Sequence, residues 1–387
     1  MACVLPVPLV TVSGRPTECG AAYGTLAADR IALNLDVYLR RFSVQGGLSQ
    51  EDVRHAGNVF RGVTREHHPR VAEMLDGVAA GAGVPRELIF ALNARTELLY
   101  AAAAPPEATD GCTAIGVLGT HTAGGHLLLA QNWDWHPDQR DAMVLLHTTD
   151  ERGHRIVTLT EAGMLAKAGL NSAGVGVCVN MLGSDRDGLR TGRPIGVPYH
   201  VLLRAALEAD SLARALRMVL HPPRNCSINL LLGQAGSAGD PASGELIDVE
   251  VVPGDCGWLH PVDGVLTHAN HFESGVGVYD KIKDWGGSSL FRAARARRLV
   301  AGAAANRKVT EDDLAVMLRD HASYPQAICR HVDERDAPLD RSESVYSVLM
   351  DLDARRMGVS AGPPCTHEYA WLDDQLSGEP RHGGLPG

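Results

Sequence analysis

The chain has 387 residues, enough for one large domain or two of ordinary size and for a full hydrophobic core without disulfide bonds. Its composition, 45% hydrophobic and 21% charged, is ordinary for a soluble globular protein. The net charge is −10 and Lys and Arg form no long run, which argues against a nucleic-acid partner.

Helices are predicted over most of the first hundred residues. Apolar residues recur at helical intervals over 18–42, 49–63, 69–83 and 85–101. Ser49 is placed to cap the second helix, and the third ends in glycines, as helices often do. A loop with two prolines at 101–111 then ends the helical part.

Strands dominate after this loop. Short β-rich runs bounded by Gly, Asn and Asp occupy 113–119, 126–135, 143–149, 155–160, 174–182, 228–233, 245–252 and 264–272. Amphipathic helices are expected at 198–220, 288–304 and 310–321, a hairpin at 344–362 that turns near Asp353, and a mobile tail at 375–387. This order indicates stacked sheets covered by helices.

Eight cysteines are spread along the chain without any C-x-x-C pair, which argues against a structural zinc site. Cys3 and Cys178 stand among apolar residues and are interpreted as small buried hydrophobes. The N-terminal run MACVLPVPLV lacks the basic start of a signal peptide, and no segment approaches 18 uninterrupted apolar residues. We therefore expect a cytoplasmic protein that does not associate with a membrane.

The tetrapeptide D-G-C-T at 110–113 marks the change from loop to strand. Gly111 has no side chain, so a thiol can approach its carbonyl. Attack by Cys112 followed by hydrolysis would cut the Gly111–Cys112 bond and leave an α-amine on Cys112. An α-amine titrates at about 8, against about 10.4 for a lysine, and can serve as general base for its own thiol. The competing interpretation is a cysteine buried in a strand.

A second motif, Q-N-W-D-W at 131–135, follows one predicted hairpin later. Asp134 could orient the new amine through a charge-assisted hydrogen bond. Trp133 and Trp135, with Met164 further along, are candidate walls of an apolar acyl pocket, although core packing explains them equally well.

Two asparagines follow predicted strands. Asn180 closes the apolar run at 169–180, and Asn270 lies in L-T-H-A-N-H-F at 266–272. A side-chain amide at a strand end can donate to a developing oxyanion. His268 and His271 form an H-x-x-H pair, but no third ligand accompanies them, so we expect no metal.

These four motifs, in this order, resemble the isopenicillin N acyltransferase family, the acyl-coenzyme A:6-aminopenicillanic-acid acyltransferases among the N-terminal-nucleophile hydrolases. Bile-salt hydrolases and penicillin V acylases are relatives of that family. The likeness extends to N-A-R-T-E at 93–97, L-R-D-H at 318–321 and I-C-R-H at 328–331. It implies an α+β fold, a four-layer αββα sandwich, cleaved into a helical segment 1–111 and a catalytic core 112–387.

The resemblance also implies roles for single residues. Cys112 matches the nucleophile, Asp134 the residue that holds its amine, and Asn180 and Asn270 the oxyanion hole. Gln131 departs from the pattern, because bile-salt hydrolases carry an arginine there, and this favours the acyltransferase branch. Members of the family hydrolyse amides or move an acyl group between an amine and a thioester.

We therefore predict a self-cleaving cysteine enzyme, an acyltransferase or amidohydrolase that acts on a small N-acyl or peptide-like substrate through a thioester at Cys112. No cofactor is expected, although acyl-coenzyme A could be a co-substrate, and the cleaved N-terminal chain is the expected protein partner. Two alternatives stay open. One is a papain-like enzyme whose internal Cys112 pairs with a histidine, although the C-G-S-C-W context is absent. The other is a non-catalytic binding protein of the same fold.

Overall fold

Two β-sheets form the centre of the molecule in the computed structural model, which describes residues 5–101, 111–189, 194–285, 287–305, 307–372 and 376. In sheet order, the larger sheet contains β1 (Leu9–Gly14), β4 (Met143–Asp150), β5 (Arg155–Glu161), β6 (Ala168–Asn171), β7 (Val175–Met181), β8 (Ile228–Gln234), β9 (Glu245–Val252) and β10 (Asp255–Leu259). The smaller sheet contains β11 (Val265–His268), β2 (Gly111–Val117), β3 (Leu128–Trp135), β12 (Glu343–Asp351), β13 (Arg356–Ser360) and β14 (Ala370–Leu372).

The two sheets pack face to face, and helices cover both outer faces. Strands β2 and β3 contact β7 of the larger sheet, and every residue of these three strands is buried. Helices α10 (Ser289–Ala304) and α11 (Glu311–Leu318) cover the smaller sheet, whereas α7 (Tyr199–Leu207) and α8 (Leu212–Leu220) pack on the larger one. Burial on both faces explains why the central strands are nearly continuous apolar runs. The predicted four-layer α+β sandwich is confirmed.

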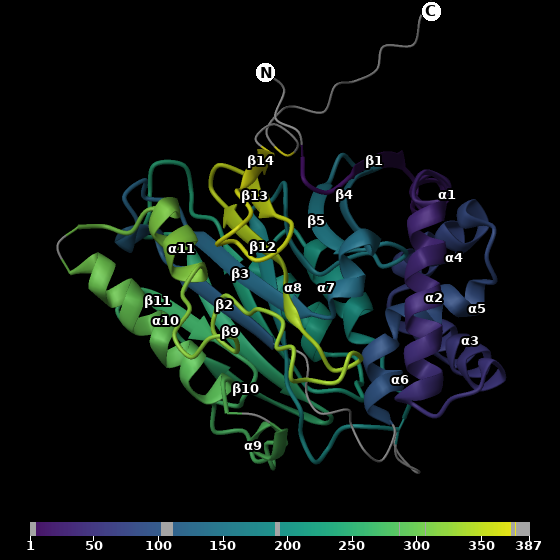
Figure 1. Ribbon diagram of the computed structural model, residues 1–387. Helices are drawn as coiled ribbons and strands as arrows, with labels where there is room; N and C mark the ends of the chain where they lie inside the picture. Colours follow the sequence, from purple (N-terminus) through teal and green to yellow (C-terminus); the bar gives the residue numbers. More distant parts are fainter. Residues whose placement is uncertain are drawn as a thin grey trace, which may run out of the picture.

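The N-terminal helices stand together at one side of the sheets, opposite α10 and α11 (Figure 1). They are α1 (Pro16–Leu26), α2 (Ala28–Val44), α3 (Gln50–His67), α4 (Pro69–Ala82), α5 (Arg86–Asn93) and α6 (Arg95–Ala101). Three shorter elements complete the part of the chain that the structure describes: the 3-10 helices η1 (Gly119–His121) and η2 (Pro137–Ala142), and helix α9 (Ile282–Trp285). None of the described helices combines the length and the apolarity that crossing a membrane requires.

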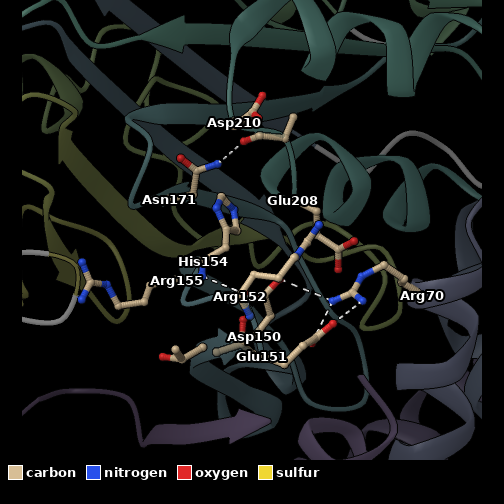
Figure 2. A network of polar contacts seen from close by, with 12 residues as sticks. Arg70, Asp150, Glu151, Arg152, His154, Arg155, Asn171, Glu208 and Asp210 are labelled. Atoms are coloured by element: carbon tan, nitrogen blue, oxygen red, sulfur yellow. Dashed lines mark hydrogen bonds and ion pairs between the residues drawn. The ribbon is translucent and has the colours of Figure 1, made fainter. Parts of the chain in front are cut away.

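The segment 1–111 shares a sheet with the rest of the chain. Strand β1 pairs in parallel with β4 along six residues, from Leu9 opposite Leu145 to Gly14 opposite Asp150. At the end of β4, Arg70 of α4 reaches Glu151, with 2.6 Å between Nη1 and Oε1, and Figure 2 shows Asp150 beside this pair. Strand pairing and ion pairs therefore join the helical segment to the larger sheet.

Local signals predicted several helix ends correctly. The side chain of Ser49 accepts a hydrogen bond from the backbone N–H of Asp52 and caps α3, as expected. Gly83 ends α4 with a φ of 67°, a left-handed conformation that suits glycine. The hairpin of β12 and β13 also forms as predicted, with Asp353 in its turn.

Three predicted helices are each broken in two. The chain leaves helical geometry at Ala27 between α1 and α2, at Ala94 between α5 and α6, and over 208–211 between α7 and α8. Ala27 and Ala94 are good helix formers, so tertiary packing decides these breaks, not propensity. Strands β1, β6, β10 and β14 also add to the predicted set. Cys3, residues 102–110 of the predicted loop and most of the predicted tail lie outside the described residues.

Candidate active site

The pairing of β2 with β3 determines where Cys112 faces. Cys112 lies opposite Trp133, and Gly111 lies opposite Asp134. Residues opposite one another share a face of the sheet, so Cys112 and Trp133 lie on one face and Gly111 and Asp134 on the other. Gln131 shares the face of Cys112, and its amide contacts β7 of the larger sheet. The Cys112 side chain therefore belongs to the interior between the two sheets.

Asn270, which follows β11, holds the backbone of Cys112. Its Oδ1 accepts a hydrogen bond from the Cys112 backbone nitrogen at 2.9 Å, and its Nδ2 donates to the carbonyl of Met181 at 3.0 Å. Arg292 of α10 donates from Nη2 to the same Oδ1 at 2.7 Å and from Nη1 to the Cys112 carbonyl. The carbonyl side of this amide thus faces the nitrogen that cleavage would release.

Asp134 is buried beside Gly111. Ser344 donates a hydrogen bond to its Oδ1 at 2.6 Å, and Nε of Arg330 lies 3.6 Å from its Oδ2. Burial raises the pKa of Asp134, while Arg330, Arg292 and Ser344 oppose that rise. A Cβ atom on Gly111 would lie 2.6 Å from Asp134 Oδ2, so only glycine permits this approach. The carboxylate therefore lies directly against the residue that precedes Cys112.

Asn180 at the end of β7 presents an unused donor. Gln131 donates a hydrogen bond to Asn180 Oδ1 at 2.8 Å. Asn180 is fully buried, and within the described part of the chain its Nδ2 has no hydrogen-bond partner. A buried amide N–H group without a partner is costly, which makes it a candidate to bind an oxygen of a reacting group. The next residue, Met181, binds Asn270, so both asparagines belong to one site.

The two tryptophans lie over a buried cluster of charges. Their rings stack with centroids 6.0 Å apart, with Lys167 over the ring of Trp133 and Arg95 over that of Trp135. Glu161 pairs with both cations, at 2.8 Å from Lys167 Nζ and 3.3 Å from Arg95 Nε. Burial raises the pKa of Glu161, but Arg95 and Lys167 outweigh it and bring the pKa far below its ordinary value.

Met164 is also buried, and its carbonyl accepts a hydrogen bond from Tyr23 at 3.2 Å. Its part in an acyl pocket with Trp133 and Trp135 stays a prediction. The histidines of the H-x-x-H pair have other partners. His268 Nε2 contacts Glu250 Oε1 at 2.8 Å, and His271 Nδ1 lies 2.9 Å from Ser289 Oγ.

Four residues of the site were not singled out from the sequence: Arg292, Arg330, Ser344 and Tyr346. Tyr346 lies opposite Trp133, and burial raises the pKa of its hydroxyl, with a further rise from Cys112. Arg330 belongs to the I-C-R-H motif that carried the family resemblance, which was the one available signal. The others come from segments at least 150 residues beyond Cys112 and have no motif of their own.

The family model described as acyl-coenzyme A:6-aminopenicillanic acid acyl-transferase matches residues 120–365. The chain belongs to this family. The matched segment contains Asp134, Asn180 and Asn270 and begins after Cys112. Membership in this acyltransferase family confirms the resemblance drawn from the motifs.

Two individual relatives are similar to the chain in sequence. The 40 kDa form of acyl-coenzyme A:6-aminopenicillanic-acid-acyltransferase of Emericella nidulans is 27% identical over 355 residues, 92% of each chain. The protein dcd1A of Dictyostelium discoideum is 26% identical over 225 residues, 54% of this chain and 48% of that protein.

Two solved structures are more distant. A penicillin V acylase from Agrobacterium tumefaciens has a TM-score of 0.45 and 16% identity, covering 69% of this chain and 88% of its own. A conjugated bile acid hydrolase from Clostridium perfringens has a TM-score of 0.41 and 12% identity, covering 68% of this chain and 93% of its own.

Proposed function

We propose that this protein is a self-processing N-terminal-nucleophile enzyme that transfers or hydrolyses an acyl group through a thioester at Cys112. One observation carries the proposal. The backbone nitrogen of Cys112 donates a hydrogen bond to Asn270, and Gly111, which carries the carbonyl to be attacked, lies against Asp134. The Asn180 amide, whose Nδ2 has no partner among the described residues, lies on the side of the sheet that carries the Cys112 thiol. This arrangement supports a single site that would combine the nucleophile, the cleavage site and an oxyanion donor.

The first step is the cleavage of the chain itself. The Cys112 thiolate attacks the Gly111 carbonyl carbon, the C–N bond breaks, and the Cys112 nitrogen takes up a proton. Water then hydrolyses the thioester and leaves a Gly111 carboxylate and an α-amine on Cys112. Asn270 Oδ1 already accepts a hydrogen bond from this nitrogen, so the new amine keeps its partner.

In the mature enzyme the neutral α-amine accepts the thiol proton as the thiol attacks the acyl carbon of a substrate. Asn180 Nδ2 donates to the oxyanion that develops. Asn270 is the second oxyanion donor that the family resemblance implies, although its Nδ2 binds Met181 before cleavage. Asp134 is the residue that the family resemblance implies holds the new amine, and it lies beside Gly111 with Arg330 and Ser344 around it.

The substrate class follows from the family. The name of the Emericella relative pairs an acyl-coenzyme A donor with an amine acceptor. For this chain we propose small N-acyl amides and acyl thioesters as acyl donors, with an amine or water as acceptor. We assign no coenzyme A site.

Trapping of the acyl-enzyme tests this chemistry. The purified protein is mixed with a panel of acyl thioesters, N-acyl amino acids and short peptides and quenched in acid, and the Cys112 peptide is analysed by mass spectrometry. The acyl mass should appear on Cys112, and an added amine should divert the acyl group from water if transfer is the reaction. An acyl group on any other residue, with turnover retained in Cys112→Ala, would contradict the proposal.

A further inference from the structure

A second cluster of reactive side chains lies outside the site just described. His321, Cys329, His331 and Cys365 each offer one metal-ligating atom, and these four atoms all lie within 4.8 Å of one another. Three come from the segment after α11, and Cys365 comes from the segment between β13 and β14. The absence of a C-x-x-C pair argued against zinc, but the fold brings together ligands that the spacing does not reveal.

We propose that these four side chains bind one Zn²⁺ ion. The separations of the ligating atoms support this. His331 Nε2 lies 3.1 Å from His321 Nε2, 3.3 Å from Cys365 Sγ and 3.6 Å from Cys329 Sγ. Tetrahedral zinc with Zn–N bonds of about 2.0 Å and Zn–S bonds of about 2.3 Å separates two nitrogens by about 3.3 Å and nitrogen from sulfur by about 3.5 Å.

Hydrogen bonds alone satisfy this cluster poorly. Nε2 of His331 is within reach of three partners, yet an imidazole nitrogen is either one donor or one acceptor at a time. A cation at the centre would satisfy all four atoms together. Two thiolates and two imidazoles are also the ligand set that zinc prefers, and both thiols release their protons to solvent when they bind it.

The surrounding backbone holds the ligands in place. The N–H of Cys329 donates to the carbonyl of Asp320 at 3.0 Å, and that of His331 donates to Pro325 at 3.1 Å. The ring of Tyr324 lies against His331, with centroids 5.2 Å apart. Cys329 is buried whereas His321 is exposed, so the site has a scaffold on one side and an entry path on the other.

The proposed zinc would also hold part of the active site. Arg330 lies between two of the ligands, and its backbone N–H donates to Ser344 at 3.0 Å. The Nε of Arg330 lies 3.6 Å from Asp134 Oδ2, and a Cβ atom on Gly111 would lie 3.3 Å from this Nε. Metal binding would therefore fix a guanidinium beside the cleavage site. This last consequence rests on the proposed function, whereas metal binding itself does not.

Metal content of the protein, purified without a polyhistidine tag under reducing conditions, tests the site. Mass spectrometry of the elements should find one zinc per chain. Cys365→Ser and His321→Ala should lose it, and Cys365→His, which restores a ligand, should retain it. Cys256→Ser is the matched control, because Cys256 lies on β10 outside the cluster, and it should keep its zinc.

Cobalt binding to the wild-type chain tests the site even if a ligand variant folds poorly. Co²⁺ exchanged into the wild-type chain should show the intense visible bands of tetrahedral cobalt and a thiolate-to-cobalt band in the near ultraviolet, both absent in Cys365→Ser. A wild-type chain that carries no zinc and shows no such bands with Co²⁺ would overturn the proposal. A Cys329–Cys365 disulfide in the reduced preparation, or full zinc content in Cys365→Ser, would do the same. Slower cleavage at Gly111 in the zinc-free chain is a separate measurement and bears on the coupling alone.

Discussion

At the scale of single residues, the proposed site contains two side-chain amides, Asn270 and Asn180, whose oxygen and nitrogen atoms bind different partners. Asn270 uses its oxygen for the nitrogen of Cys112 and for Arg292, and its nitrogen for Met181. Asn180 accepts from Gln131 through its oxygen, and no partner for its nitrogen is found among the residues that the structure describes. This difference makes Asn180 the sharper test of the oxyanion hole.

Replacing Asn180 with alanine should therefore lower kcat by about 10²- to 10³-fold, the usual cost of losing one oxyanion donor. The fold should survive, because Gln131 still donates to the carbonyl of Val179 at 2.6 Å. Steady-state kinetics with the substrate found in the trapping experiment, beside a thermal unfolding curve, measure both effects. Activity within a few fold of wild type in a folded Asn180→Ala variant would remove Asn180 from the mechanism.

Sequence motifs placed four of the site residues in the right order, but the side chains around them were out of reach. The motifs at 110–113, 131–135, 169–180 and 266–272 lie together in the fold, whereas the roles given to their residues stay predictions. Arg292 reaches the site from α10 without any sequence signal, and Arg330 reaches it from the loop after α11, where the I-C-R-H motif was the only signal. The His–Cys cluster was missed for the same reason, since Cys365 lies 34 residues beyond His331.

At the scale of elements, helices α1 and α4 of the N-terminal part pack closely against each other at glycine residues. A Cβ atom on Gly20 of α1 would lie 2.0 Å from the carbonyl oxygen of Met74 in α4, and one on Gly81 of α4 would lie 2.0 Å from that of Ala21. Backbone atoms cannot yield as side chains do, so these glycines allow the two helices to approach.

Gly20→Ala should lower the free energy of unfolding by about 1–3 kcal/mol or more, because the added methyl group meets backbone. Gly62→Ala is the matched control. Gly62 is exposed in α3, with nothing within 4 Å of a Cβ, so alanine there should raise stability by about 0.5–1 kcal/mol. Urea unfolding of both variants would settle the sign at each position, and equal effects would refute the packing argument.

A buried carboxyl group joins α6 to the start of α7. Glu97 Oε1 accepts a hydrogen bond from the backbone N–H of Tyr199 at 2.8 Å, and burial raises the pKa of Glu97 to about 7 from an ordinary 4.5. The folded state therefore binds the proton more tightly than the unfolded state. Its contribution to stability is full below pH 4.5 and is lost as pH rises to about 7.

Glu97→Gln keeps the accepting oxygen and removes the titration. Between pH 4.5 and pH 8, wild type should therefore lose on the order of 3 kcal/mol more stability than the variant. Thermal unfolding at several pH values in a Cys112→Ala background, where the chain should stay intact, measures this difference. Identical pH dependence in the two proteins would mean that Glu97 is not protonated in the folded state.

Strands were predicted better than helices because their apolar runs are short and bounded by turn residues. The runs at 113–119, 126–135 and 174–182 correspond to β2, β3 and β7. Helix continuity failed at Ala27 and Ala94, where the backbone turns although local propensity favours a helix. Helix α1 packs closely on α4, and Thr96 and Glu97 of α6 hydrogen-bond with Tyr199 of α7. These contacts join residues far apart in the sequence, so local propensity does not predict them.

At the scale of the whole molecule, one core spans both sides of the proposed cleavage. Ile31 and Leu92 from the helices belong to the same hydrophobic cluster as Leu145 and Leu170 from the larger sheet. The ion pair of Arg70 with Glu151 is about one-third exposed and contributes at most about 1 kcal/mol. Apolar burial and the β1–β4 pairing therefore hold the two parts together.

After cleavage the two chains should co-elute in gel filtration, and 1 M salt should not separate them. Salt screens exposed ion pairs but leaves strand pairing and apolar burial intact. Separation should need denaturant. Release of the N-terminal chain by salt alone would mean that surface charges, and not the shared core, join the two parts.

The identity of the mature N-terminus tests the central claim most directly. Denaturing mass spectrometry of active protein should show two chains, residues 1–111 and 112–387, and amine labelling should mark the α-amine of Cys112. Cys112→Ala should give one uncut, inactive chain of 387 residues. A preparation that turns over substrate as a single full-length chain would contradict the account.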